Sequence, residues 1–349
     1  MTSIQFRCIV VLVLMLIALP SQASVRVEPK RTGQWRAIHL LDYNSDADLD
    51  ALGQNLERLV DMGINVVILE VDYGFAFKSY PMLRRGSNPI TREGARKFAA
   101  KCRKLGIRLI PEFQSLGHQS WKGETFPLLT VHPSFDTTPG AFPGNEGVYC
   151  REWDPLNPDV TRIVFQLMDE IIDGFGADAF HVGMDEIFLL SSDLSPSTKG
   201  KDPAALFAKV INEIHRHLVG DRHVEMLMWG DRLIDGKKYD YGEWEASMNG
   251  TAAAIDMIPK DIIVCPWHYE LKDAYPSIPM FIEKGFRVLP TGWKDVNATK
   301  ALIDYTRQYD SSKLLGYMFT TWGVKKEALV DFPALVEGLK QMQTKRSRS

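Results

Sequence analysis

Two adjacent carboxylates, Asp185 and Glu186, close the segment HVGMDE at residues 181–186. This segment ends a short apolar run, so the sequence predicts that both acids lie at the end of a buried strand. Burying two neighbouring carboxylates costs desolvation and mutual repulsion, which raises the pKa of one of them. A carboxyl group with a raised pKa is suited to general acid catalysis. On spacing alone, an exposed Asp-Glu pair or a pair at a helix N-terminus explains the segment equally well.

Aromatic and polar side chains follow other apolar runs in the same way. They are His118, Trp229, Asp231, Trp267, Tyr269, Trp293 and Trp322. Sugar rings stack on the faces of indole rings, and an N-acetyl group needs an apolar box. Each tryptophan taken singly is explained equally well by packing in the core or under a loop. Four of them after successive predicted strands indicate a sugar-binding pocket.

The elements that must position these residues alternate along the chain. The predicted strands are 37–42, 65–71, 107–112, 178–183, 224–229, 261–266, 286–290 and 314–320. Amphipathic stretches between them predict helices at 47–62, 92–105, 158–173, 203–218, 279–284, 300–309 and 328–342, and several of these end at a glycine such as Gly63 or Gly174. Such alternation is typical of parallel strands joined by helical crossovers.

Eight such strands predict an α/β fold, a (β/α)8 TIM barrel with a single domain. A doubly wound open sheet is the alternative, but no GxGxxG segment follows the first strand. In a barrel, all the residues named above lie on the C-terminal face of the sheet, where active sites are found. Residues 113–157 are rich in Pro, Gly and aromatic residues and are predicted to form a long loop over that face.

The segment HVGMDE resembles the H-x-G-G-D-E motif of glycoside hydrolase family 20, the β-N-acetylhexosaminidases. LIPEFQSLGH at 109–118 is similar to the strand of that family that ends in a Gly-His pair. This segment and residues 156–158, 228–231 and 320–322 are most similar to the hexosaminidase D-like branch of the family. The resemblance covers about residues 33–340. Two positions differ from the common pattern: Met184 replaces the second glycine of the motif, and Val324 replaces a glutamate that commonly follows the last tryptophan.

The resemblance implies substrate-assisted catalysis, in which the 2-acetamido oxygen of the substrate attacks the anomeric carbon. It implies that Glu186 is the general acid and then the base, and that Asp185 holds the acetamido N–H group. A retaining enzyme of the two-carboxylate type instead needs a second carboxylate about 5–5.5 Å from the acid. The seventh strand is followed by no carboxylate before Asp295, which favours a substrate that brings its own nucleophile. Glu112, Glu70 and Asp72 remain rivals because they lie near strand ends.

The resemblance also implies roles for the surrounding residues. Trp322 is expected to line the acetamido pocket, and Tyr269 or Tyr241 to hold the acetamido oxygen. His118 is expected to support the acid together with Asp72 or Glu70; a purely structural histidine is the alternative. Asp231 is expected to contact a sugar hydroxyl in place of the glutamate that Val324 replaces.

Metal and cofactor sites are not expected. His39, His181 and His268 lie near strands, but they fall on different strands without the spacing of a zinc motif. Arg36 stands before the first strand, away from its C-terminal end, so we do not place it in the site. The sequence predicts no cofactor.

Composition and the N-terminus restrict the class of protein. The chain has 349 residues and a formal net charge of −3, which argues against nucleic acid as a partner. Arg7, the apolar run 8–19 and a small-x-small site after Ala23 predict a cleaved signal peptide over 1–23, with the catalytic domain at 24–349. An uncleaved membrane anchor is the alternative. Cleavage leaves three cysteines, so at least one is a free thiol.

The sequence therefore predicts an exported, periplasmic or extracellular β-N-acetylhexosaminidase that releases terminal N-acetylhexosamine with retention. Two other functions stay open: a glycan-binding barrel without activity, suggested by Met184 and Val324, and a two-carboxylate retaining glycosidase of other specificity. The expected partner is a glycan or amino-sugar substrate, with no nucleic acid and no membrane beyond the export signal. The oligomeric state is left open.

Overall fold

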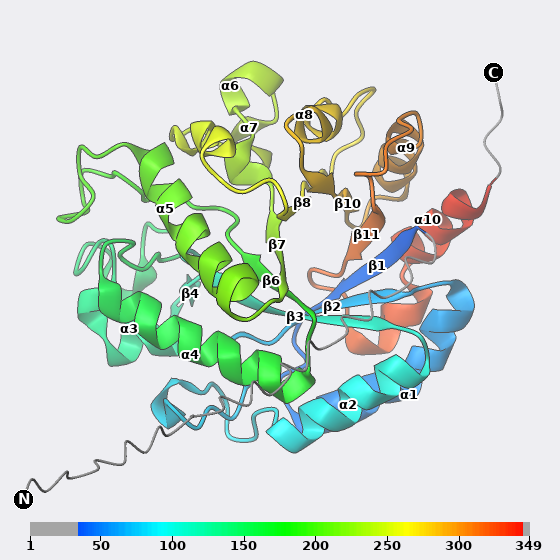
Figure 1. The fold of residues 1–349 in the computed structure, drawn as a ribbon, viewed down its shortest axis with the longest axis horizontal. Helices are drawn as coiled ribbons and strands as arrows, with labels where there is room; N and C mark the ends of the chain where they lie inside the picture. Colours follow the sequence, from blue (N-terminus) through cyan, green and yellow to red (C-terminus); the bar gives the residue numbers. More distant parts are fainter. Residues whose placement is uncertain (1–33, 345–349) are drawn as a thin grey trace, which may run out of the picture. The chain divides into compact units, whose positions relative to one another are not determined.

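Parallel strands surround the centre of the molecule, and helices lie outside them (Figure 1). The computed structural model describes residues 34–344, which fall within one compact unit, and the predicted signal peptide lies outside the described residues. The barrel strands in chain order are β1 (Trp35–Leu40), β2 (Val66–Glu70), β3 (Arg108–Ser115), β6 (Ala179–Gly183), β7 (Glu225–Trp229), β8 (Ile263–Cys265), β9 (Arg287–Val288), β10 (Thr291–Gly292) and β11 (Gly316–Thr320).

The extended segment 287–292 closes the sheet into a barrel. Its first part, β9, pairs with β8, and its second part, β10, pairs with β11, which returns to β1. Only Leu289 and Pro290 separate the two parts, and proline has no N–H group for a ladder hydrogen bond. Counted as one interrupted strand, β9 and β10 give eight parallel strands. The predicted (β/α)8 barrel is confirmed.

The helices occupy the crossovers, as the periodicity predicted. They are α1 (Asp46–Met62), α2 (Arg92–Lys104), α4 (Pro158–Phe175), α5 (Pro203–His215), α8 (Ser277–Glu283), α9 (Val296–Thr306) and α10 (Pro333–Gln343). Helix α1 begins at Ser45, whose hydroxyl accepts the Asp48 N–H, and ends at Gly63 in the left-handed region.

The predicted helix end at Gly174 was wrong. Helix α4 continues through Gly174 and ends at Gly176, whose φ is 62°. Gly174 instead lets the Phe75 ring pack closely against the helix, because a Cβ atom there would lie 2.7 Å from that ring.

Two loops depart from the simple strand–helix alternation. The predicted long loop between the third and fourth barrel strands is present, and it carries a small hairpin, β4 (Ser120–Trp121) with β5 (Glu124–Thr125), and the short helix α3 (Pro127–Val131). The crossover between β7 and β8 has the short helices α6 (Gly236–Tyr239) and α7 (Gly242–Glu245) instead of one long helix. Both segments follow the C-terminal ends of strands, so they contribute to the face where the predicted site lies.

The barrel interior is filled by small and branched side chains from alternate positions of the strands. They include Ala37, Val66, Ile68, Ile110, Ala179, Leu227, Ile263, Leu289 and Met318. A larger apolar layer lies between sheet and helices. Cys102, Cys150 and Cys265 are buried free thiols. Among residues 34–344, no helix is both long enough and apolar enough to cross a membrane.

Candidate active site

The two predicted catalytic carboxylates lie on a tight turn at the end of β6. Gly183, Met184 and Glu186 have φ values of 64°, 76° and 53°, so three of the four residues after Val182 are left-handed. Neighbouring side chains of a strand point to opposite faces, and this turn abolishes that alternation. His118 Nε2 lies 3.3 Å from Asp185 Oδ2 and 3.2 Å from Glu186 Oε2. Both acids therefore face one histidine.

The Gly-His segment packs directly on this turn. A Cβ atom at Gly117 would lie 2.5 Å from the side chain of Ile187 and 3.2 Å from the Asp185 carbonyl oxygen. A Cβ atom at Gly183 would lie 1.8 Å from the Gln114 side chain. The two glycines thus let strands β3 and β6 bring His118 and the acids together.

Asp231 holds the backbone of the turn. Its Oδ2 accepts the N–H of Glu186 at 2.9 Å and the Nε–H of Arg232 at 2.6 Å. The side chains of Asp231 and Arg232 are almost fully buried. Burial raises the pKa of Asp231 to about 6, against the opposing charge of Arg232. This position favours a supporting role for Asp231 over the hydroxyl contact that the sequence analysis expected.

A second clamp, which the sequence reasoning missed, follows Glu186. Glu152 is fully buried, and its Oε1 accepts the N–H groups of Phe188 at 2.5 Å and Leu189 at 2.7 Å. Burial raises the pKa of Glu152 to about 7. Glu152 lies in the long loop, where the only sequence signal was a richness in aromatic residues, Pro and Gly.

The electrostatics of the site centre on His118. Burial alone would lower the pKa of His118, but the charge of Asp185 and hydrogen bonds to Asp185 and Glu186 raise it well above its ordinary value. Its expected partners lie elsewhere: Asp72 accepts the Gln114 N–H at 2.7 Å, and within the described chain no ion pair joins His118 to Asp72 or Glu70. His118 is therefore a cation shared by the two acids.

Glu112 lies deeper in the barrel, between two histidines. Its Oε2 is 2.7 Å from His39 Nε2, and its Oε1 is 3.0 Å from His181 Nδ1. His39 Nδ1 lies 2.9 Å from Thr320 Oγ1. Burial opposes ionisation of Glu112, yet the two histidines hold its pKa well below the ordinary value. The enclosed position of Glu112 favours support of the site over nucleophilic attack.

The two other rival carboxylates lie at the end of β2. Burial raises the pKa of Asp72 to about 7 and that of Glu70 well above its ordinary value. Both therefore favour the protonated form more than a free carboxyl does. A protonated carboxyl is a poor nucleophile, so these shifts disfavour both residues for nucleophilic attack.

Four aromatic side chains, here called the pocket aromatics, stand together above the strand ends: Trp267, Tyr269, Trp293 and Trp322. Tyr269 stacks on Trp267 with ring centroids 4.8 Å apart and lies 5.3 Å from Trp293. The Trp322 Nε1–H donates to the Tyr269 hydroxyl at 2.9 Å, and the Trp293 Nε1–H donates to the Trp322 carbonyl at 2.9 Å. The structure thus joins four predicted residues into one wall.

Trp229 and Tyr241 lie outside this wall. Trp229 is buried, and its ring centroid lies 5.2 Å from that of His39 and 4.7 Å from that of His181. Tyr241 stacks on His268 at 4.3 Å. Of the two tyrosines considered for the acetamido oxygen, Tyr269 is the one next to Trp322.

Among residues 34–344, the side chains that could hold a metal ion form two groups. His39, Glu70 and Glu112 have ligand atoms close enough to share an ion, and so do His118, Asp185 and Glu186. In both groups the histidine Nε2 already binds carboxylate oxygens of the same group. Of the three histidines weighed for zinc, His39 and His181 meet at Glu112, whereas His268 binds Glu245 and Ser277. The absence of a metal cofactor stays a prediction.

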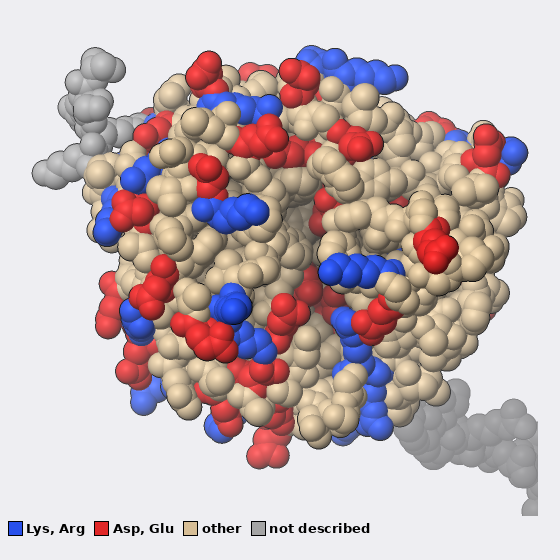
Figure 2. Space-filling view, turned by 180° about the vertical axis from the view of Figure 1, so that it is seen from behind, with Lys and Arg blue, Asp and Glu red and all other residues tan. Residues whose placement is uncertain are grey.

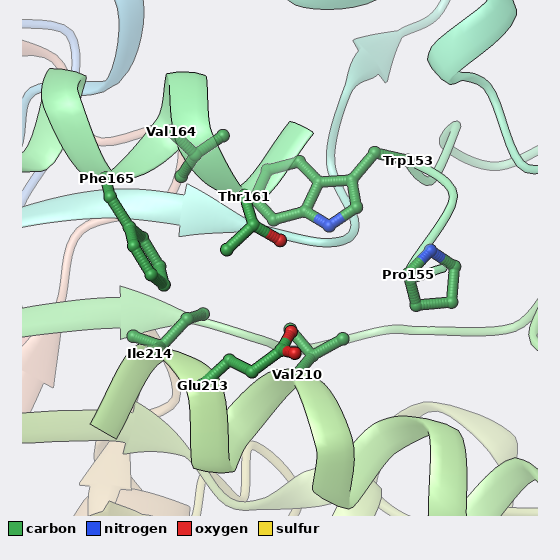
Figure 3. A pocket seen from close by; sticks show the side chains of 8 residues that line it. All are labelled: Trp153, Pro155, Thr161, Val164, Phe165, Val210, Glu213 and Ile214. Atoms are coloured by element: carbon green, nitrogen blue, oxygen red, sulfur yellow. The ribbon is translucent and has the colours of Figure 1, made fainter. Parts of the chain in front are cut away.

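Figure 2 shows a face that is hollowed near its centre, with acidic side chains in and around the hollow and charges of both signs elsewhere. A crevice between α4 and α5 is lined by Trp153, Phe165, Glu213 and their neighbours (Figure 3). It contains none of the predicted site residues.

Comparison with known proteins identifies the same family as the motif. The model of the glycosyl hydrolase family 20 catalytic domain matches residues 71–323. Lacto-N-biosidase of Bifidobacterium bifidum is 23% identical over 232 residues, which are 63% of this chain and 19% of that protein.

Solved structures of the family share the fold. The chitobiase of Flavobacterium johnsoniae has a TM-score of 0.67 at 18% identity, over 90% of this chain and 48% of that one. A β-N-acetylhexosaminidase of Bacteroides fragilis has a TM-score of 0.63 at 14% identity, over 88% of this chain and 65% of that one. Dispersin B has a TM-score of 0.55 at 16% identity, over 90% of this chain and 99% of that one.

This chain thus spans about half of the chitobiase and a fifth of the lacto-N-biosidase. The family model nevertheless covers well over half of this chain, and it includes the turn with Asp185 and Glu186. The chain belongs to glycoside hydrolase family 20.

Proposed function

We propose that this protein is a β-N-acetylhexosaminidase that releases terminal N-acetylhexosamine with retention by substrate-assisted catalysis. One observation carries the proposal: Asp185 and Glu186 face the same histidine, and the charges of both acids act on Tyr269 of the pocket aromatics. The other carboxylates at the strand ends are engaged in internal bonds or shifted toward protonation. This pattern supports a site with an acid but without a protein nucleophile.

In the first step, Glu186 protonates the leaving oxygen while the substrate's acetamido oxygen attacks the anomeric carbon. The bond from that carbon to the leaving oxygen breaks, and an oxazolinium ion forms. Asp185 accepts a hydrogen bond from the acetamido N–H and stabilises the positive charge that develops there. His118, charged and next to both acids, balances Asp185 when Glu186 is neutral.

In the second step, Glu186 takes a proton from water, and the water oxygen attacks the anomeric carbon. The bond to the acetamido oxygen breaks, so two inversions give net retention. Glu186 is then protonated again and ready for the next cycle.

The pocket aromatics suit the N-acetyl group. The Tyr269 hydroxyl accepts a hydrogen bond from Trp322, so its own proton is available to donate to the acetamido oxygen. Glu245 fixes this residue, since its Oε1 accepts the Tyr269 N–H at 3.0 Å and its Oε2 lies 2.7 Å from His268 Nδ1. The indole faces of Trp267 and Trp322 supply the apolar surface for the methyl group.

The test compares 4-nitrophenyl N-acetyl-β-glucosaminide and N-acetyl-β-galactosaminide with the plain β-glucoside. We expect hydrolysis of an N-acetyl substrate only, and its loss in Glu186→Gln, while Glu213→Gln at the surface serves as control. An N-acetylglucosamine thiazoline, which resembles the oxazolinium ion, should inhibit strongly. Equal hydrolysis of the plain glucoside would refute the substrate-assisted mechanism, and binding without hydrolysis would favour the glycan-binding alternative.

We further propose that residues 1–23 direct export and that the chain belongs to the hexosaminidase D-like branch. The layout of Arg7, the apolar run and the site after Ala23 supports export. Mass spectrometry of the protein from its native cells should give a mature N-terminus at Ser24. An intact N-terminus in the cytosolic fraction would contradict export.

A further inference from the structure

Exposed aromatic side chains gather at one place beside the candidate acid. Nine large hydrophobic side chains are exposed among residues 34–344, and the three aromatic ones are Trp121, Tyr149 and Trp244, at 46%, 37% and 45% exposure. They come from three separate segments: β4, the end of the long loop, and α7. Such convergence of exposed aromatic surface is unusual unless the surface binds something.

These side chains contact one another through Tyr149. Its ring centroid lies 5.5 Å from that of Trp121, 4.9 Å from Trp244 and 6.0 Å from Phe188, while Phe188 and Trp244 are 5.5 Å apart. We call Trp121, Tyr149, Phe188 and Trp244 the outer aromatic cluster. Within the described chain, no ring contact joins this cluster to the pocket aromatics.

The outer aromatic cluster touches the catalytic carboxylate. Tyr149 lies 6.0 Å from the His118 ring, and its pKa is raised by burial, by the charge of Glu186 and by a hydrogen bond to that carboxylate. Phe188 follows Glu186 by two residues. The cluster therefore adjoins Glu186 through Tyr149 and is separate from the pocket aromatics in its ring contacts.

Buried polar contacts hold the cluster in place. The Arg232 Nη2 donates to the carbonyl oxygens of Glu243 and Trp244, each at 2.6 Å, and its guanidinium lies 4.8 Å from the Phe188 ring centroid. Through Asp231, the same guanidinium is linked to the Glu186 N–H. The segment that carries Trp244 and the backbone of the acid are thus fixed by one buried network.

We propose that the outer aromatic cluster binds the sugar that becomes the leaving group, a β-linked pyranose of an oligosaccharide. This inference rests on the proposed function, because Glu186 must protonate the oxygen that joins the two sugars. A pyranose with equatorial substituents presents an apolar C–H face that stacks on an aromatic ring. A sugar bonded to that oxygen lies next to Glu186 and within reach of Tyr149 and Trp244.

The test separates the two sugar sites by the size of the leaving group. N,N′-diacetylchitobiose has a pyranose leaving group, whereas N-acetyl-β-glucosaminyl fluoride has a single atom that cannot stack. We expect Trp244→Ala to lower kcat/KM for the disaccharide about tenfold and to leave the fluoride within twofold, as expected for loss of one aromatic contact. Trp244→Phe should retain most activity, and Met257→Ala, an exposed side chain outside the cluster, should change neither substrate.

Equal losses on both substrates, or no loss on the disaccharide, would overturn the proposal. Failure of the proposed function would look different, since the unmodified protein would then hydrolyse neither compound. In that case, titration of diacetylchitobiose into Glu186→Gln and into Glu186→Gln with Trp244→Ala decides the matter. Weaker binding by about tenfold in the double variant supports the subsite, and unchanged binding refutes it.

Discussion

Replacing Glu112 by glutamine tests whether the buried His39–Glu112–His181 cluster supports the site. The carboxylate is fully buried and makes contacts of 2.7 and 3.0 Å with the two histidines. Glutamine has nearly the same shape and can keep the hydrogen bond to His39, but it has no charge. Losing the charge from this hydrogen bond and from the ion-pair contact with His181, at about 1.5 kcal/mol each, lowers the free energy of unfolding by about 3 kcal/mol.

The pH dependence of this loss follows from the direction of the pKa shift. The pKa of Glu112 is lower in the folded protein than in the unfolded chain, where it is about 4.3. Its ionised form therefore stabilises the fold above pH 4.3, and this contribution is lost as the pH falls through the folded pKa. The difference between parent and Glu112→Gln should be constant from pH 7 to pH 5 and should shrink below pH 4.

Urea unfolding followed by tryptophan fluorescence measures the effect, since Trp229 packs on both histidines. Glu213→Gln is the matched control: Glu213 pairs with Lys209 one helical turn away on α5, where we expect at most about 0.5 kcal/mol. A loss below 1 kcal/mol at pH 7 would refute the reasoning. A difference that grows on acidification would refute the assigned direction of the pKa shift.

Three further variants test the site residues. Tyr269→Phe removes the proton proposed for the acetamido oxygen, so kcat should fall about 10²-fold in steady-state assays while the urea midpoint stays unchanged. His118→Gln removes a cation whose pKa is raised in the fold. The stabilising effect of this cation is full below about pH 6.5 and is lost as the pH rises through the folded pKa. The variant should therefore lose more stability relative to the parent at pH 6 than at pH 10. Met184→Gly relieves a left-handed φ of 76° but removes a fully buried side chain, so urea unfolding should show a net loss of about 2 kcal/mol.

The strands, most helices and the position of Asp185 and Glu186 at a strand end were predictable because their signals are local. Ser45 and Gly63 bound α1 through contacts within a few residues, and the sequence pattern contains both ends. The helix end predicted at Gly174 was wrong because this glycine makes room for the Phe75 ring, which comes from another crossover. Spacing along the chain does not encode such a contact.

Strand register decides which predicted aromatic residues reach the pocket. Trp229 pairs with Cys265, so Trp267 stands two residues further along the neighbouring strand, about 7 Å nearer the mouth of the barrel. Trp229 is therefore packed among the buried histidines, whereas Trp267 joins the wall. A sequence shows that both follow apolar runs, but the offset between strands depends on the closed barrel. The outer aromatic cluster depends on the same long-range information, because its members are spread over residues 121–244.

The carboxylates at the strand ends differ in what already binds them, and this difference determines the chemistry more than residue type does. Glu152 accepts two backbone N–H groups just after Glu186. Asp231 accepts the Glu186 N–H and a bond from the Arg232 side chain, and Glu245 accepts the Tyr269 N–H and binds the His268 ring. Those acids are committed to holding the site together. Asp185 and Glu186 share the His118 ring, and Glu186 also meets Tyr149. In the proposed mechanism these two acids bind an N–H group and exchange a proton, and the other buried acids hold the backbone and side chains around them.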